Sequence, residues 1–289
     1  MTATQCIWPV GALLGEGPVW DEGERALYFV DIKRPAVHRF DPRSGDRQSW
    51  PMPEPIGCIA RRRRGGFVAG LRSGFAFLDL GRGTIERIGN PDPEHRDNRF
   101  NDGKCDTHGR FWAGTMDDRE RSPTGWLYRL DADLSWRRMD GGYVVTNGPA
   151  FSPDGRIIYH TDTTGRTVYA FDVDADGVLA NKRIFVRFAA DDGYPDGMTI
   201  DADGHLWVAH WGGWRLTRFA PHGAVDRVVA LPVAQVTSCA FGGPGFETLF
   251  VTTASIGLDE AARGAQPLAG GLFALRPGVR GLAAHTFLG

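Results

Sequence analysis

The sequence has 289 residues and is 42% hydrophobic, which is enough to bury a sizeable core. Lys and Arg number 33 against 35 Asp and Glu, and the resulting net charge of −2 excludes a global field that would gather nucleic acid or an anionic membrane. No stretch approaches the roughly 18 to 20 apolar residues that span a bilayer, so we expect a cytoplasmic monomer with neither nucleic acid nor membrane as partner.

The cysteines and histidines show no metal-binding spacing. None of the four cysteines forms a CxxC pair, and the eight histidines form no HxxxH or HExxH pair. We therefore expect structural thiols in a reducing compartment and no thiolate or histidine-dominated metal site. The cysteines are Cys6, Cys58, Cys105 and Cys239.

Paired apolar runs recur along the whole chain between turns rich in Gly and Pro. Each pair follows a third short run, and the turn glycines Gly109, Gly155 and Gly204 are separated by 46 and 49 residues. A repeat of this length with three or four antiparallel strands is typical of a propeller blade. The sequence therefore predicts an all-β, six-bladed β-propeller in a single domain over residues 1–289. In chain order the pairs are 25–31 with 35–41, 66–72 with 74–80, 110–116 with 125–131, 156–162 with 166–172, 205–211 with 215–221, and 247–253 with 270–276.

Two further segments have predicted places in this ring. Residues 5–10 (QCIWPV) are expected to pair with the last blade, which would close the ring and cover its open edges. The basic run 61–64, followed by two glycines, is predicted to be a solvated hairpin turn rather than a nucleic-acid contact.

The repeat register selects a set of polar residues. Counting back eight residues from the turn glycines gives an oxygen-bearing side chain in three repeats: Asn101, Asn147 and Asp196. The same phase falls on Gly57 in the second repeat, and in the first repeat Glu16 lies one residue from it. Asp154 of SPDG aligns instead with Asp203 and His108 in the outward turns. The two PDG tripeptides at 153–155 and 195–197 are thus predicted to differ in place and role.

The first strands of propeller blades line the central channel, so Glu16, Asn147 and Asp196 are expected to meet at one mouth. Two carboxylates and a carboxamide in a partly buried channel would repel one another and lack partners without a cation or a hydrogen-bond network. A divalent metal ion would resolve both problems. The alternative is that EGP, NGP and PDG supply only turn chemistry.

Seven segments together resemble the SMP-30/gluconolactonase/regucalcin family of six-bladed propellers. They span most of the chain in the family's order: LGEGPVW (14–20), NRFNDGKCD (98–106), FWAGTM (111–116), TNGP (146–149), YPDGM (194–198), LWVAHWGG (206–213) and SCAFGG (238–243). The resemblance implies a metal-dependent sugar lactonase whose ligands map onto Glu16, Asn147 and Asp196, the residues that the register selects.

The resemblance also implies substrate contacts at Arg99 and Asn101. For a further acidic contact, counting lands on Arg119, which leaves Asp118 and Glu120 as candidates in a loop, 117–124, that could cover the mouth. Trp211 and Trp214 could wall the pocket against a sugar face. The alternative for Arg99 and Asn101 is a salt bridge at a strand end and a turn cap.

A lactonase mechanism follows from these assignments. A metal ion would polarise the lactone carbonyl, and Asp196 is the candidate general base for the attacking water. Oxygen ligands suit Ca²⁺, Mg²⁺ or Mn²⁺, and Zn²⁺ or Fe²⁺ stay open. The expected substrate is a xylono-, arabino-, galactono- or gluconolactone. The alternatives are a related propeller esterase or phosphotriesterase and a nonenzymatic, regucalcin-like calcium-binding protein.

Overall fold

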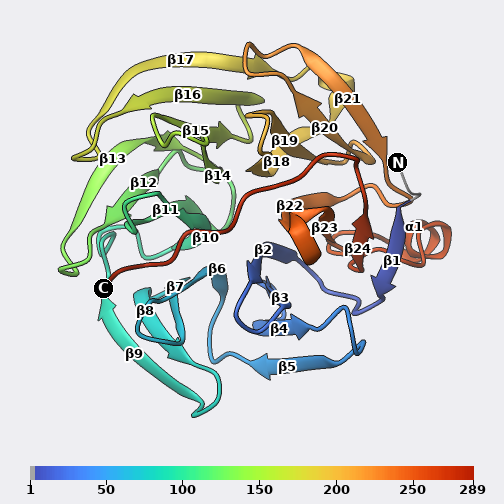
Figure 1. The fold of residues 1–289 in the computed structure, drawn as a ribbon, viewed down its shortest axis with the longest axis horizontal. Helices are drawn as coiled ribbons and strands as arrows, with labels where there is room; N and C mark the ends of the chain where they lie inside the picture. The colour runs from blue at the N-terminus through green and yellow to red at the C-terminus, as the bar shows by residue number, and fades with distance from the viewer. Residues whose placement is uncertain (1–3) are drawn as a thin grey trace.

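The computed structural model describes residues 4–289. Six antiparallel sheets of four strands each stand around a central channel (Figure 1). In five of them the strand order follows the chain, and the sixth combines the last three strands with the first. The predicted six-bladed β-propeller is confirmed.

The blades occupy the chain in succession. The first two contain β2 (Gly15–Asp21), β3 (Ala26–Asp31), β4 (Ala36–Phe40) and β5 (Arg47–Pro51), then β6 (Ile56–Arg61), β7 (Phe67–Leu71), β8 (Gly74–Asp79) and β9 (Thr84–Gly89). The next two contain β10 (Asn98–Cys105), β11 (Phe111–Asp117), β12 (Gly125–Leu130) and β13 (Trp136–Tyr143), then β14 (Thr146–Phe151), β15 (Ile157–Asp162), β16 (Thr167–Val173) and β17 (Leu179–Arg187). The last two contain β18 (Tyr194–Ile200), β19 (Leu206–Trp211), β20 (Arg215–Phe219) and β21 (Val225–Ala230), then β22 (Val236–Gly242), β23 (Thr248–Thr253), β24 (Leu272–Leu275) and β1 (Gln5–Trp8).

Helical structure is confined to short connections. These are η1 (Ala190–Asp192), η2 (Pro244–Phe246) and α1 (Glu260–Ala265). No helix among residues 4–289 has both the length and the apolar character needed to cross a bilayer.

Burial explains why the sequence shows paired apolar runs. They form the second and third strands of each blade, whose apolar side chains pack between neighbouring blades; all six residues of β3 are buried. The outermost strands face solvent on one side and are mostly exposed, as in β17. Trp112 and Trp207, one from each of two blades, are fully buried in this inter-blade core. All four cysteines are free, and three of them are buried.

The ring is closed at its N-terminal end as predicted. β1 pairs antiparallel with β24, with Gln5 opposite Ala274 and Cys6 opposite Phe273. The last blade therefore joins both ends of the propeller, and its outer edge is covered by a strand from the start of the chain.

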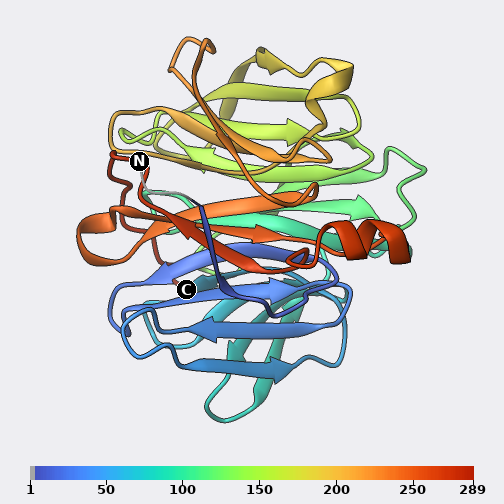
Figure 2. The same ribbon diagram turned by 90° about the vertical axis from the view of Figure 1, so that its right-hand side faces the viewer.

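Residues 277–289, here called the strap, cross the centre of the ring on one face, which we call the rear face (Figure 1). Gly281 bridges to Asp201, the N–H of Leu288 donates to the Gly109 carbonyl, and Phe287 forms a bridge with Arg62. The strap thus connects several blades. Figure 2 shows α1 on the opposite, front side of the disc.

The basic run 61–64 does form the turn between β6 and β7, but only part of it is solvated. Arg63 and Arg64 are exposed, whereas the Arg62 guanidinium lies 3.3 Å from the centroid of the Phe77 ring and donates to the Gly289 carbonyl. The run therefore helps to anchor the strap.

We expect Phe287→Ala to destabilise the propeller by about 3 to 5 kcal/mol, because the ring is fully buried between blades and its loss leaves a cavity. Leu282→Ala on the same strap is the control, since Leu282 is 40% exposed, and should cost under about 1 kcal/mol. Urea denaturation would measure both. Equal, small losses would show that the strap is not fixed to the ring.

Candidate metal and substrate site

Every innermost strand has an irregular register beside the channel. The shifts lie between Glu16 and Val19, Ile56 and Cys58, Phe100 and Gly103, Asn147 and Ala150, Pro195 and Met198, and Val236 and Ser238. A β-bulge interrupts the alternation of side chains and re-aims residues out of the sheet. Polar residues in or next to these bulges can therefore point along the channel instead of into the inter-blade core.

Three of the bulges bring the residues selected by the register to one place. Glu16 on β2, Asn147 on β14 and Asp196 on β18 line a single cavity of about 300 Å³ at the front mouth. All three are at most 5% exposed. Arg99 and Asn101 of β10 line the same cavity. Residues far apart in sequence thus converge as the propeller register predicts.

Gly57 explains why the second blade contributes no side chain at this phase. A Cβ atom there would lie 2.4 Å from the backbone oxygens of Phe100 and Asn101. The glycine therefore allows β10 to approach β6 closely, and Asn101 reaches the cavity from the neighbouring blade.

The carboxyl groups of Glu16 and Asp196 each accept one backbone hydrogen bond. Glu16 accepts the N–H of Gly17 at 2.9 Å and Asp196 accepts the N–H of Gly197 at 3.0 Å. Burial raises the pKa of Glu16 to about 8, with nearby Asp102 adding to the effect. Burial also raises the pKa of Asp196 well above its usual range, and the Glu16 charge contributes. Bringing both carboxylates together in their charged form requires a cation.

The donor set fits a divalent cation. Within residues 4–289, neither Glu16 nor Asp196 forms an ion pair with a basic side chain. The buried Ser238 hydroxyl also lacks a hydrogen-bond partner, and its oxygen would lie 2.3 Å from a Cβ atom on Gly197, beside Asp196. Two carboxylates and a carboxamide oxygen are ligands that hard divalent ions prefer.

An amide network orients Asn147. Its Nδ2 donates to the Thr163 hydroxyl at 2.9 Å, and its Oδ1 accepts from Asn101 Nδ2 at 3.1 Å. Asn101 Nδ2 also donates to the Thr146 carbonyl at 2.7 Å, and Arg99 Nη1 donates to Asn101 Oδ1 at 2.7 Å. These contacts fix which atom of each amide is the oxygen, so Asn147 presents its oxygen on the side of Asn101.

Asp118 is held by cations. Its Oδ1 accepts from Arg99 Nε at 2.5 Å and from Lys33 Nζ at 2.7 Å, and Arg72 approaches the other oxygen at 3.8 Å. These cations hold the pKa of Asp118 below its usual range against the effect of burial. Asp118 therefore orients Arg99 and Lys33, and both of these line the cavity while Asp118 does not.

The loop 117–124 brings a different acidic residue to the cavity. Glu120, which has a positive φ of 57°, lines the cavity, whereas Arg119 points to Asp97 at 3.2 Å. Asp117 shapes the turn by accepting the N–H groups of residues 119, 121 and 122. Of the two acidic candidates, Glu120 thus lies in the cavity wall and Asp118 does not.

The two tryptophan candidates and the second PDG tripeptide lie at different places. Trp211 lines the cavity, while Trp214 is 44% exposed and is not part of its wall. Asp154 is exposed in the turn after β14, at the opposite end of that strand from Asn147. Its carboxylate accepts from the Ser152 hydroxyl at 2.6 Å, as expected for a turn residue.

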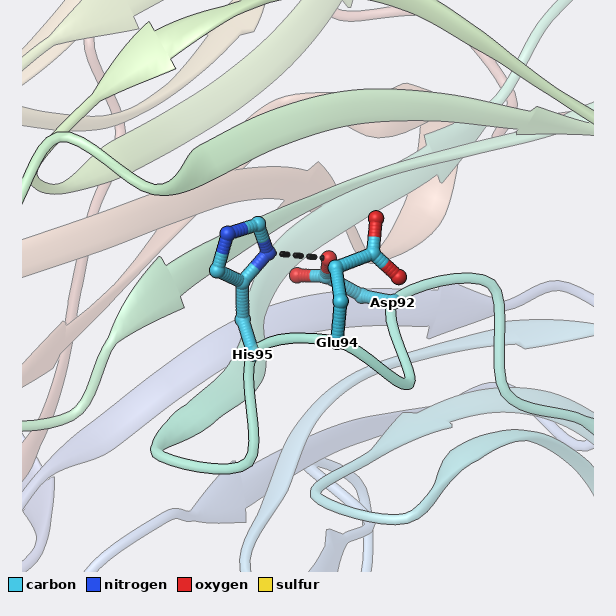
Figure 3. Close-up of side chains that lie close together, drawn as sticks. All are labelled: Asp92, Glu94 and His95. Atoms are coloured by element: carbon cyan, nitrogen blue, oxygen red, sulfur yellow. Dashed lines mark hydrogen bonds and ion pairs between the residues drawn. The ribbon is translucent and has the colours of Figure 1, made fainter.

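Asp92, Glu94 and His95 form a second cluster that could in principle hold an ion (Figure 3). His95 Nδ1 lies 2.7 Å from Asp92 Oδ1, and Asn98 donates to the other oxygen at 2.7 Å. Arg138 pairs with both Asp92 and Glu94. Because side chains already satisfy these carboxylates, the cluster is a brace for the segment before β10.

Three charged residues of this region do not stand out in the sequence pattern. Lys33 comes from the β3–β4 connection, and Asp102 and Lys104 follow Asn101 on β10. The register selects one position per blade and so passes over both β10 residues. The run NDGK itself was the available signal, since three polar residues in a channel strand are unusual in a core.

Comparisons with known proteins identify the family of the chain. A profile of the SMP-30/gluconolactonase/LRE-like region matches residues 14–255. The chain is 37% identical to a 6-deoxy-6-sulfogluconolactonase of Pseudomonas putida, with 99% of this chain and 98% of the relative covered, and 39% identical to an L-arabinolactonase of Azospirillum brasilense, with 96% and 92% covered. The crystal structure of a calcium-binding protein, regucalcin, from Agrobacterium tumefaciens superposes with a TM-score of 0.94 at 26% identity, covering 99% of this chain and 97% of that one. The chain belongs to the SMP-30/gluconolactonase/LRE-like family.

Proposed function

We propose that the protein is a metal-dependent sugar lactonase that hydrolyses an aldonolactone to the aldonic acid. The observation that carries the proposal is the meeting of Glu16, Asn147 and Asp196 in a cavity that Arg99 and Asn101 also line, with no ion pair of Glu16 or Asp196 among residues 4–289. Two relatives that match nearly the whole chain act, by their names, on sugar lactones.

Glu16, Asn147 and Asp196 would hold one divalent ion, which when bound would polarise the lactone carbonyl and stabilise charge on its oxygen. Their oxygen ligands favour Ca²⁺, Mg²⁺ or Mn²⁺, and the similarity to the calcium-binding regucalcin of Agrobacterium tumefaciens supports calcium. Zn²⁺ and Fe²⁺ stay as alternatives.

The remaining chemistry belongs to side chains of the cavity. Asp196 is the candidate base: it takes a proton from the water that adds to the carbonyl carbon, and the ring C–O bond then breaks with the proton passing to the ring oxygen. Arg99 and Asn101 offer donors and an acceptor to ring hydroxyl groups. Glu120 offers a second acceptor from the loop 117–124. An apolar ester would leave these groups unpaired, which disfavours the esterase alternative.

A pH-stat screen of γ- and δ-aldonolactones should show turnover above spontaneous hydrolysis that is lost with chelator and restored by a divalent ion. Aryl esters and phosphotriesters in parallel test the esterase alternative. If calcium binds but no lactone is turned over, the protein is a nonenzymatic binder.

Asp196→Asn should lower kcat by about 10² or more at saturating metal, because the variant keeps an oxygen ligand but loses the base. The matched control is Asp154→Asn in the other PDG turn, which should change turnover by less than about threefold. Initial rates of both variants, with the spontaneous rate subtracted, would measure the two changes in kcat. Near wild-type turnover in Asp196→Asn would remove its catalytic role, and equal damage from both variants would contradict the site.

Glu120→Ala should raise KM for the lactone by about tenfold, because a charged acceptor for substrate hydroxyls is lost. Arg119→Ala is the neighbouring control and should change KM by less than about twofold, since Arg119 is exposed and pairs with Asp97. Steady-state kinetics of both variants would show whether the loop contributes through Glu120. An unchanged KM in Glu120→Ala would exclude it as a substrate contact.

A further inference from the structure

Two side chains of β10 lie behind the candidate metal site. Asp102 is 1% exposed, and its carboxylate accepts two backbone N–H groups, from Gly103 at 2.7 Å and from Gly148 at 3.0 Å. Gly148 directly follows Asn147 and has a positive φ of 81°. Asp102 therefore holds the bulge of β14 at the residue next to the candidate ligand.

Lys104 makes the corresponding contact with β18. Its Nζ donates to the Met198 carbonyl at 2.5 Å. Met198 is the residue at which pairing of β18 with β19 resumes after the bulge that contains Asp196. One strand thus reaches the backbone of two others, just beyond Asn147 in one and just beyond Asp196 in the other.

Neither side chain belongs to the front cavity. Asp102 and Lys104 line a smaller cavity of about 110 Å³ on the rear side, which the strap covers with residues 282–285. The position of Lys104 also favours the charged forms of Glu16 and Asp102. Without it, three carboxyl groups would share the channel with no cationic side chain behind them.

We propose that Asp102 and Lys104 are positioning residues that hold β14 and β18 from the rear, so that Asn147 and Asp196 meet at one cation. The inference rests on the proposed function, because it assumes that these two residues bind the ion. It assigns the rear pair no contact with substrate.

The test measures the Kd of Ca²⁺ and of Mn²⁺ by calorimetry on chelator-treated protein. Asp102→Asn places an amide N–H against a backbone N–H donor. Lys104→Met leaves the Met198 carbonyl without its side-chain donor and the Asp102 carboxylate without a nearby positive charge. Each should raise Kd by about 10- to 100-fold, the effect typical of groups that orient metal ligands. Lys104→Arg retains a cationic donor and should recover most of the affinity.

The control is Asp201→Asn. Asp201 is fully buried and accepts backbone and side-chain donors in the turn after β18, including Trp207 Nε1 at 2.8 Å, away from the front cavity. The Asp201→Asn substitution should lower the thermal midpoint of the metal-free protein but change the Kd of the metal ion by less than about threefold. Circular dichroism would establish that each variant is folded. If Asp102→Asn does not fold, the Kd of Lys104→Met alone tests the positioning role.

Kinetics at saturating metal give a second readout. The positioning variants should lower kcat and leave KM for the lactone within about threefold, because Arg99 and Glu120 are untouched. Variants that lose stability but keep the wild-type Kd would overturn the positioning role alone. Absence of metal binding by the wild-type protein would overturn the proposed function as well.

Discussion

The channel of this propeller contains three buried carboxyl groups, those of Glu16, Asp102 and Asp196. Water cannot solvate them fully, and burial raises the pKa of each; repulsion from a neighbouring carboxylate adds to the effect at Glu16 and Asp196. Carboxylates in such surroundings need hydrogen-bond donors and positive charge. Asp102 has two backbone donors, and Lys104 lies behind it. Glu16 and Asp196 face the open cavity, where the proposed divalent ion would supply the compensating charge.

The fold brings these carboxyl groups together in the channel. Six innermost strands surround one channel, and a bulge in each allows polar side chains to leave the pattern of the sheet. Pairing of β1 with β24 and the rear strap fix the ring, so the strands cannot drift apart. A site shared by strands from separate blades depends on this closure, because no single blade contains more than one of the three candidate ligands.

Much of the fold and of the candidate site could be predicted from the sequence because propeller repeats have a fixed phase. The phase placed Asn147 and Asp196 at one mouth and Asp154 in an outer turn, as the structure does. It could not place side chains that depend on contacts between blades. Asp118 and Glu120 are equal candidates from the sequence, and only the contacts of Asp118 with Arg99 and Lys33 distinguish the two positions.

We propose that Glu16, Asn147 and Asp196 share one divalent ion. Anomalous diffraction from crystals soaked in Mn²⁺ tests it most directly, because the difference map locates the ion without reference to activity. We expect a strong peak within bonding distance of one oxygen from each of the three side chains. A peak at Asp92, Glu94 and His95 with none at the front cavity would contradict it, and so would a map with no site in the channel.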